Sequence, residues 1–393
     1  MKNKAVILGT NYYIGLSVIR CLGMKGIHTV AMDYEQVNTY AAKSKYLTER
    51  HIMPHYRNEE EAALRYLIDY GRRQLTKPVL FPCADPYVEF IDRHLDVLRA
   101  YYLINMTEQG FWSSVMDKGN LHRLAVQHGV RVPETAYPGE PGFETNVLNE
   151  IGFPCIVKPA DSAMFVKAFR VKMFKCHTFE ELDEAIKKAK SAGLEVVVQR
   201  IVPGFDDHMY TFDAYVNQSG KVTHWMTCQK LRQFPINFGA STFTRQKHVP
   251  ELFEIGAPFL EAIGYLGFGE VEFKKDASNG QFYLIEINVR TTTLNVLLNK
   301  CGINFPLLAY MELTGSEIGA KAVQQDTGIV FNYLYEDLLS ARDYVRTKQL
   351  SRRQVLRSYF VRQAPAIWSM DDPAPAFHFL LMLIRKLKRR LIS

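Results

Sequence analysis

The first hundred residues alternate short apolar runs with stretches of helical periodicity. Residues 5–9 and 28–33 are nearly continuous apolar runs of strand length, and residues 15–24 between them repeat apolar positions at helical spacing. A second helical stretch, 59–73, precedes another apolar run at 79–83. Because strands and helices alternate, this part of the chain is predicted to form a parallel, doubly wound α/β sheet.

The pattern changes after about residue 106. Helical stretches at 116–128 and 178–192 are followed by strands that are joined in pairs by short turns. Such antiparallel hairpins predict a second domain of α+β type, and the signals after Gly315 become helical and then irregular. The predicted strand pairs are residues 209–217 with 221–228 and residues 269–274 with 281–288.

These patterns divide the chain into three parts. We expect an α/β domain over residues 1–105 and an α+β domain over residues 106–320, followed by a C-terminal extension over residues 321–393. A composition of 47% hydrophobic and 23% charged residues is typical of a folded protein and excludes a disordered or fibrous chain.

Charge is concentrated at the C-terminal end. The chain carries a net charge of +7, but residues 341–393 hold twelve Lys and Arg against three Asp, a balance of +9. The other 340 residues therefore sum to −2, which does not indicate a nucleic-acid surface, and we expect no nucleic-acid partner.

The cysteines and the apolar segments indicate the cellular location of the protein. The six cysteines stand singly without a C-x-x-C pair, which predicts neither structural zinc nor a disulfide framework. No apolar window reaches the roughly 18 residues that span a bilayer, and the start of the chain does not match a secretory signal. We therefore expect a cytoplasmic protein.

The basic tail has two interpretations. An apolar run, residues 377–384, is followed by the basic stretch 385–392. As an amphipathic helix it could lie on an anionic membrane, making the protein peripheral at the inner face. Alternatively, a last helix packs on the body and leaves its basic end in solvent.

The chemistry-bearing residues begin with an acidic group on one predicted hairpin. Glu286, Asn288 and Arg290 alternate along a strand and so share one face, and pairing of the two strands would bring Glu272 opposite Glu286. Such oxygen ligands suit Mg²⁺ held jointly with substrate phosphates. The alternative is a solvated strand whose acids are neutralised by Arg290.

Upstream residues supply candidate phosphate and nucleotide contacts. Lys118 begins a helix, and Lys158 ends an apolar strand where burial favours an anionic partner. For either lysine alone, a side chain that reaches solvent is the simpler interpretation. The stretch 199–204 is a strand running into a turn whose backbone could contact adenine, with Asp206 placed for a ribose hydroxyl.

Gly9, Gly15 and Asp33 offer a different nucleotide site. They resemble the dinucleotide-binding fingerprint, in which an acid ends the second strand, but the G-x-G-x-x-G spacing is absent. A weaker alternative function is therefore an NAD-dependent oxidoreductase, and turn formation alone also explains the glycines.

The order of these features resembles the ATP-grasp superfamily, in particular its carboxylate–amine ligases and, among those, D-aspartate ligases. The resemblance covers roughly residues 1–315. The segments that carry it are Leu8–Thr10, Pro82–Asp85, Met116–Lys118, Val157–Ser162, Gln199–Gly204, Gly264–Gly267, Val271–Lys274 and Ile285–Arg290.

The resemblance implies a fold and a set of roles. Residues 1–105 would be a pre-ATP-grasp domain of Rossmann-like form. The next domain would hold ATP between two lobes, of about 106–195 and 196–320. The residues implied to bind ATP are Lys118, Lys158, Gln199, Arg200, Ile201, Val202 and Asp206. The residues implied to bind Mg²⁺, or Mn²⁺ in its place, are Glu272, Glu286 and Asn288.

Some positions depart from the family pattern. The loop expected to cover the phosphates, residues 162–167, lacks the usual glycines, Gln199 replaces a common acid, and Val289 replaces a common proline. None of these changes removes a charge that the chemistry needs.

The implied reaction is ATP-dependent formation of an amide or peptide bond through an acyl phosphate, giving ADP and phosphate. Its substrates would be a small carboxylate and an amine, such as an amino acid and a precursor of the cell wall or a surface polymer. Arg290 is the expected catalytic residue, because a guanidinium can grip a carboxylate or an acyl phosphate. Ser162, Lys230 and Arg232 are further substrate candidates; for Lys230 and Arg232 the alternative is a pair of cations on a solvated hairpin. A non-catalytic nucleotide-binding module is the alternative from another class.

Overall fold

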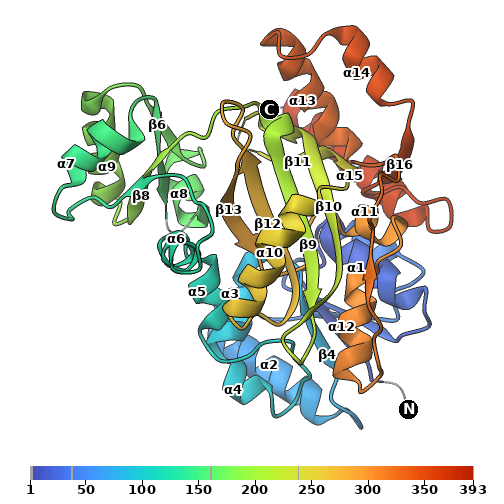
Figure 1. The fold of residues 1–393 in the computed structure, drawn as a ribbon. Helices are drawn as coiled ribbons and strands as arrows, with labels where there is room; N and C mark the ends of the chain where they lie inside the picture. The colour runs from blue at the N-terminus through green and yellow to red at the C-terminus, as the bar shows by residue number, and fades with distance from the viewer. Residues whose placement is uncertain (1–2, 37–38, 160–161, 238, 393) are drawn as a thin grey trace.

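The computed structural model describes residues 3–36, 39–159, 162–237 and 239–392 (Figure 1). Three β-sheets organise these residues. In Figure 1 a small lobe stands to one side of a large sheet, with the N-terminal domain beneath them.

The N-terminal domain is built on a four-stranded parallel sheet in the order β3-β2-β1-β4, which confirms the predicted α/β fold. Every residue of β1 is buried, as expected for a central strand covered on both faces. The strands are β1 (Ala5–Leu8), β2 (Thr29–Asp33), β3 (Glu49–Ile52) and β4 (Val79–Pro82). The helices are α1 (Tyr13–Gly23), η1 (Tyr40–Lys43), α2 (Glu60–Arg72), α3 (Asp85–Arg93) and α4 (Leu95–Leu98).

The small lobe follows, with a sheet in the order β5-β8-β6-β7. Its strands are β5 (Thr135–Ala136), β6 (Cys155–Pro159), β7 (Phe174–Cys176) and β8 (Val196–Arg200). Its helices, with two that lead into it, are α5 (Phe111–Met116), α6 (Lys118–Gln127), α7 (Phe143–Asn146), η2 (Val147–Ile151), α8 (Ser162–Phe169) and α9 (Phe179–Ser191).

The segment expected as a phosphate-covering loop is helix α8 instead. Its residues Ala163 to Phe169 are apolar or helix-compatible and contain no glycine, and Phe165 packs against Phe169 and Phe174 at centroid distances of 4.8 and 4.9 Å. This aromatic contact explains why a glycine-free sequence is helical here. Ser162 begins α8, and its side chain, like residues 160–161, lies outside the described part.

The large lobe contains an eight-stranded sheet in the order β13-β12-β9-β10-β11-β15-β16, with β14 paired to β10. Both predicted hairpins, β9–β10 and β12–β13, are present. The strands are β9 (Met209–Val216), β10 (Val222–Phe234), β11 (Ala240–Gln246), β12 (Gly267–Lys275), β13 (Phe282–Asn288), β14 (Lys321–Ala322), β15 (Ile329–Asn332) and β16 (Arg362–Pro365). The short helix η3 (Asp206–His208) precedes β9. The helices α10 (Pro250–Ala262), α11 (Asn295–Lys300) and α12 (Phe305–Leu313) pack around it.

The boundaries differ from the expected ones in two places. Strand β8 belongs to the sheet of the small lobe, so that lobe extends past residue 195 to about residue 200. The segment 321–393 contributes three strands to the large sheet and is therefore part of the large lobe rather than a separate extension.

The C-terminal segment ends in helices α13 (Leu334–Arg346), α14 (Arg352–Ser358) and α15 (Ala374–Ile392). Buried Asp372, just before α15, accepts hydrogen bonds from Arg20 Nε at 2.9 Å, Ser44 Oγ at 2.6 Å and the Lys45 amide at 3.0 Å. The end of the chain is thus fixed to the N-terminal domain.

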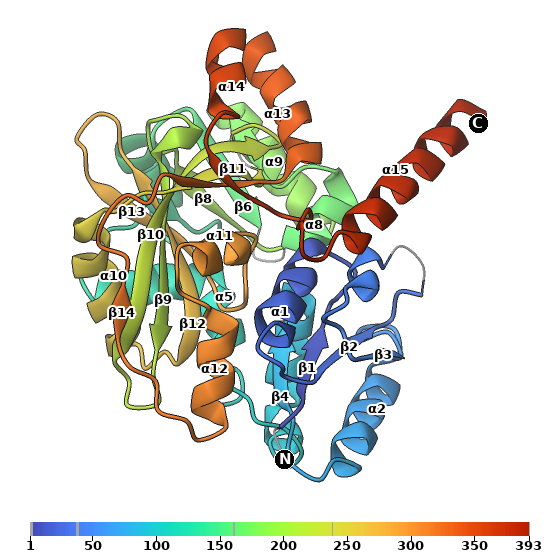
Figure 2. The ribbon, with the colours of Figure 1, turned by 90° about the vertical axis from the view of Figure 1, so that its right-hand side faces the viewer.

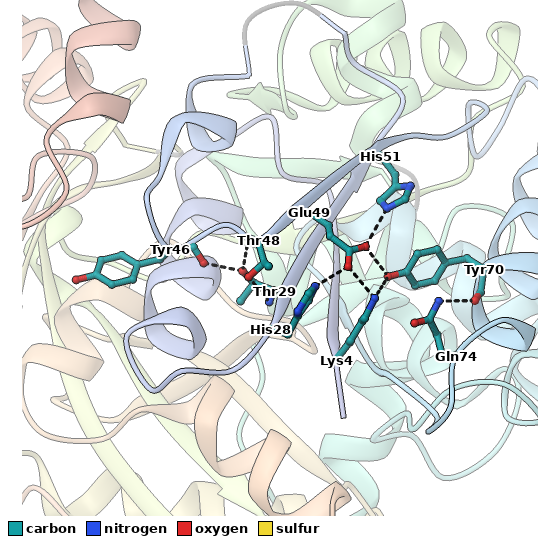
Figure 3. Close-up of polar contacts among 9 residues, drawn as sticks. All are labelled: Lys4, His28, Thr29, Tyr46, Thr48, Glu49, His51, Tyr70 and Gln74. Atoms are coloured by element: carbon teal, nitrogen blue, oxygen red, sulfur yellow. Dashed lines mark hydrogen bonds and ion pairs between the residues drawn. The ribbon is translucent and has the colours of Figure 1, made fainter. Parts of the chain in front are cut away.

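A polar network covers the edge strand β3 of the N-terminal sheet (Figure 3). Glu49 accepts hydrogen bonds from Lys4 Nζ at 2.7 Å and Tyr70 Oη at 3.2 Å, and it contacts His28 and His51 at 2.6 and 3.2 Å. Burial alone would raise the pKa of Glu49, but the bonds from Lys4, His51 and His28 outweigh it and lower the pKa to about 2.

This network makes a stability prediction. Because the folded pKa is depressed, the contribution of the Glu49 carboxylate is fully present above about pH 4.5 and is lost as the pH falls toward about 2. Glu49→Gln should lower the free energy of unfolding by about 1 kcal/mol at pH 7 and by much less at low pH, measured by urea denaturation. The exposed Glu317→Gln is the matched control; equal losses in both variants would contradict the assignment.

Candidate active site

Two lysines of the predicted phosphate site meet at the end of β6. Lys158 is buried, and its Nζ lies 3.2 Å from Gln199 Oε1 on β8. Lys118, at the start of α6, donates from Nζ to the Pro159 carbonyl at 3.0 Å. Both predicted phosphate contacts thus lie near the end of β6, close enough for their charges to interact.

The surroundings of Lys158 make its proton easier to lose than that of an exposed lysine. Burial and then the nearby Lys118 charge lower the pKa of Lys158 to about 8, against the opposing effect of Glu286 and Glu272 of the large lobe. A buried ammonium is costly without an anionic partner, so Lys158 is suited to binding a phosphate.

This shift predicts a pH dependence of ATP binding. Above about pH 8 the free protein loses the Lys158 charge, so the affinity for ATP should fall, by up to about tenfold per pH unit. Lys158→Arg should bind ATP with little change over the same range, because guanidinium stays protonated. Titration calorimetry measures both, with Lys175→Arg on β7 as control. A wild-type affinity that is constant above pH 8 would refute this role.

The acidic residues lie on the facing hairpin of the large lobe. Glu272 pairs directly with Glu286 across β12 and β13, as the sequence predicts, and Glu270 pairs with Asn288. Asn288 Nδ2 donates to Glu270 Oε1 at 3.0 Å, so the amide oxygen of Asn288 faces away from Glu270. Glu270 also accepts from Thr292 Oγ1 at 2.7 Å.

One lysine partly neutralises this group. Lys230 reaches across β9, and its Nζ lies 2.6 Å from Glu272 Oε2 with both side chains buried. Even so, burial and the neighbouring Glu286 and Glu270 carboxylates raise the pKa of Glu272 to about 7, against the opposing effect of Lys230. The cluster therefore carries more negative charge than Lys230 can neutralise, which favours a further cation.

The donor set suits Mg²⁺. In the described part of the chain, no three His, Cys, Asp or Glu side chains converge closely enough to hold a metal by themselves. Glu272, Glu286 and the Asn288 oxygen instead offer two carboxylates and an amide. Mg²⁺ prefers such a partial set, completed by substrate phosphates and water.

Arg290 lies at the junction with the N-terminal domain. Its guanidinium binds Asp85 at the start of α3 through Nε at 2.6 Å and Nη2 at 3.1 Å. A cavity of about 370 Å³ opens beside this pair, lined by the turn at residues 9–14 and by the loop at residues 83–86. Arg290 can therefore reach a carboxylate in this cavity, in a position that Asp85 now occupies.

The first turn of the N-terminal domain does not favour a dinucleotide. Buried Asp33 accepts from the Asn11 amide at 3.0 Å, the Glu35 amide at 3.2 Å and Tyr87 Oη at 3.3 Å. Its carboxylate thus fixes the turn after β1, and contact with a ribose would require these bonds to break.

The predicted adenine hinge follows Gln199. Gln199 bridges Lys158 and the Thr135 hydroxyl, to which its Nε2 donates at 3.0 Å, and the next residues, Ile201 and Val202, leave the strand. The Arg200 side chain points to Glu134 and to Asp276 at 3.2 Å, so it joins the two lobes and only its backbone remains for a nucleotide.

Asp206, the predicted ribose contact, is buried and already bonded. Its carboxylate accepts from Gln233 Nε2 at 2.6 Å, from the Asn237 amide at 2.8 Å and from Tyr344 Oη. A ribose hydroxyl would have to displace one of these donors.

Lys230 and Arg232 lie on a buried strand rather than on a solvated hairpin, because β10 continues to Phe234. Arg232 forms a bidentate pair with buried Asp337 of α13, at 2.9 and 2.7 Å, and its Nη1 donates to Ser358 at 2.9 Å. These bonds attach the C-terminal helices to the sheet, so the structure does not favour Arg232 as a substrate contact.

The ion pair of Arg232 and Asp337 allows a test that distinguishes a structural role of Arg232 from a substrate-binding role. Arg232→Met leaves Asp337 buried without its cation and should reduce stability by about 3 kcal/mol, measured by urea denaturation. Exposed Arg352→Met is the control. Unchanged stability together with a raised substrate KM would instead support a substrate role.

Some residues of the site were not predicted. Glu270 stands two positions before Glu272, so strand alternation could have placed both on one face. Asp85 and Arg290 are 205 positions apart in the sequence, so no local pattern predicts their contact.

The chain is similar in sequence to known proteins. The family described as "Carbamoyl-phosphate synthase L chain, ATP binding domain" matches residues 117–302. D-aspartate ligase of Enterococcus faecium is 26% identical over 254 residues, covering 62% of this chain and 60% of its own length. The chain thus spans less than two thirds of that relative.

Two solved structures share the fold. The biotin carboxylase domain of 2-oxoglutarate carboxylase from Hydrogenobacter thermophilus, in complex with MgADP and bicarbonate, has a TM-score of 0.65 at 17% identity, covering 84% of this chain and 74% of its own. The L-amino acid ligase from Bacillus licheniformis has a TM-score of 0.59 at 15% identity, covering 80% and 74%.

Residues 117–302 thus match a family of ATP-binding domains, and the chain shares its fold with a biotin carboxylase domain and an L-amino acid ligase. By sequence the chain is similar to a D-aspartate ligase.

Proposed function

We propose that the protein is an ATP-dependent carboxylate–amine ligase that forms an amide or peptide bond and releases ADP and phosphate. The observation that carries the proposal is the facing arrangement of Lys118 and Lys158 on one lobe and Glu272 and Glu286 on the other. This arrangement suits a polyphosphate between the lobes, and the cavity beside Arg290 suits a small carboxylate next to it.

The proposed reaction has two steps. The substrate carboxylate attacks the γ-phosphorus of ATP, which breaks the bond to the β-phosphate oxygen and gives an acyl phosphate and ADP. The amine then attacks the acyl carbon, and phosphate leaves with the bonding electron pair. Phosphoryl transfer needs little covalent help, so positioning and charge neutralisation supply most of the catalysis.

The chain's own residues divide this work. Lys118 and Lys158 bind phosphate oxygens, and Arg290 orients the carboxylate and the acyl phosphate through its paired N–H groups. Glu272, Glu286 and Asn288 would hold Mg²⁺, which supplies charge neutralisation at the phosphates when bound. Mn²⁺ has the same ligand preference and could replace it.

We propose that the substrates are an amino acid and a precursor of the cell wall or a surface polymer. We also propose that the protein is cytoplasmic. The support is the likeness to D-aspartate ligase and to an L-amino acid ligase, together with a cavity of about 370 Å³, enough for one small molecule. The test is phosphate release with ATP and a panel of D- and L-amino acids, with and without such precursors.

The metal assignment has a direct test. Glu286→Gln should reduce ADP release to background while leaving the fold intact, because one of two carboxylates for Mg²⁺ is lost without a change in shape. Circular dichroism checks the fold, and exposed Glu254→Gln on α10 is the matched control. An unimpaired Glu286→Gln protein would refute the assignment. ATP binding without amine-dependent turnover across the panel would favour a non-catalytic module instead.

A further inference from the structure

Helix α15 carries apolar side chains on two opposite sides. On the inner side, Phe379 packs against Tyr40, Tyr333 and Tyr335, at centroid distances of 5.2, 6.3 and 5.9 Å. This contact holds the first half of the helix against the body, and Figure 2 shows the rest projecting away from it.

The outer side repeats apolar residues at the spacing of a helix face. Phe377, Leu380, Leu381 and Ile384 stand at positions i, i+3, i+4 and i+7, and all are exposed, Phe377 by 57%. Trp368 lies edge-on to Phe377 at 6.1 Å, and Met370 nearby in the chain is 89% exposed. We call these six residues the tail surface. Contacts with the other described residues leave these six side chains exposed.

The charge beyond the tail surface has a single sign. Arg385, Lys386 and Lys388 are exposed along α15, two more arginines follow in the sequence, and no acid occurs after Asp372. Asp371 and Asp372 are themselves paired, with Lys45 and Arg20. An apolar face that includes tryptophan and continues into a cationic end matches the interface of an anionic bilayer.

We propose that the tail surface docks α15 on an anionic lipid bilayer, with the apolar residues at the headgroup boundary and the basic end against acidic headgroups. Among the described residues, no helix is both long and apolar enough to cross a bilayer. The charge argues against a second copy of the chain, which would bring a like-charged helix to the surface, and the exposed apolar side chains argue against nucleic acid.

The test uses the full chain without ATP, so that its outcome does not depend on the ligase reaction. Vesicles of phosphatidylcholine, with and without phosphatidylglycerol, are sedimented with the protein. We expect binding to the anionic vesicles only, weakened by salt. Trp368 is the exposed one of three tryptophans, so its emission should shift to the blue on binding.

Two pairs of variants separate the contributions of charge and apolar surface. Reversing Arg385, Lys386 and Lys388 to Glu should lower the partition coefficient by roughly tenfold or more, because each basic residue near the surface contributes. The same reversal of Arg352, Arg353 and Arg357 on α14 changes the net charge equally and should have little effect.

For the apolar part, Leu381→Asp should abolish the Trp368 shift, whereas Leu356→Asp on α14, also exposed, should not. Circular dichroism checks that all variants fold. The proposal is overturned if neither vesicle binds, if both vesicles bind equally, or if both charge reversals act alike. It is also overturned if Leu381→Asp instead dissolves a dimer, or if the basic end binds duplex DNA while the vesicles stay unbound.

Discussion

The cluster of carboxylates on β12 and β13 is the constraint on which the rest of the site depends. Glu270 and Glu272 are buried, Glu286 stands beside them, and Lys230 contacts Glu272. Charges removed from water are costly unless they are matched, so this cluster favours a cation between the lobes. The two ammonium groups on the small lobe favour an anion at the same place. A metal–polyphosphate complex satisfies both sides at once.

Local signals predicted much of the fold and the order of the site residues. The strand of β1, the helix of α2 and the hairpin of β12 and β13 follow from apolar periodicity and turn residues within a few positions of one another. The opposition of Glu272 and Glu286 follows from the same hairpin, because alternation along two paired strands fixes which side chains meet.

Other features depend on contacts between distant segments, and the sequence did not reveal them. β15 and β16 are short strands whose partners lie about ninety and thirty residues away along the chain, so no hairpin pattern marks them. Arg232 looked like a solvated cation because its partner, Asp337, is 105 residues away. The helix at α8 depends on the Phe165 contact with Phe174 across a turn, which a glycine-poor loop sequence did not suggest by itself.

The anchoring of Asp372 has a mechanical consequence. Three hydrogen bonds hold Asp372, two positions before α15, to α1 and to the segment after η1. The start of the helix is therefore fixed to the N-terminal domain and is not a flexible linker. Nineteen helical residues give it a length of about 28 Å. Whatever its far end touches is therefore held at a set distance and angle from the cavity beside Arg290. A helix fixed at its start in this way orients the whole molecule relative to what it binds, whereas a flexible tail would only raise the local concentration of the protein there.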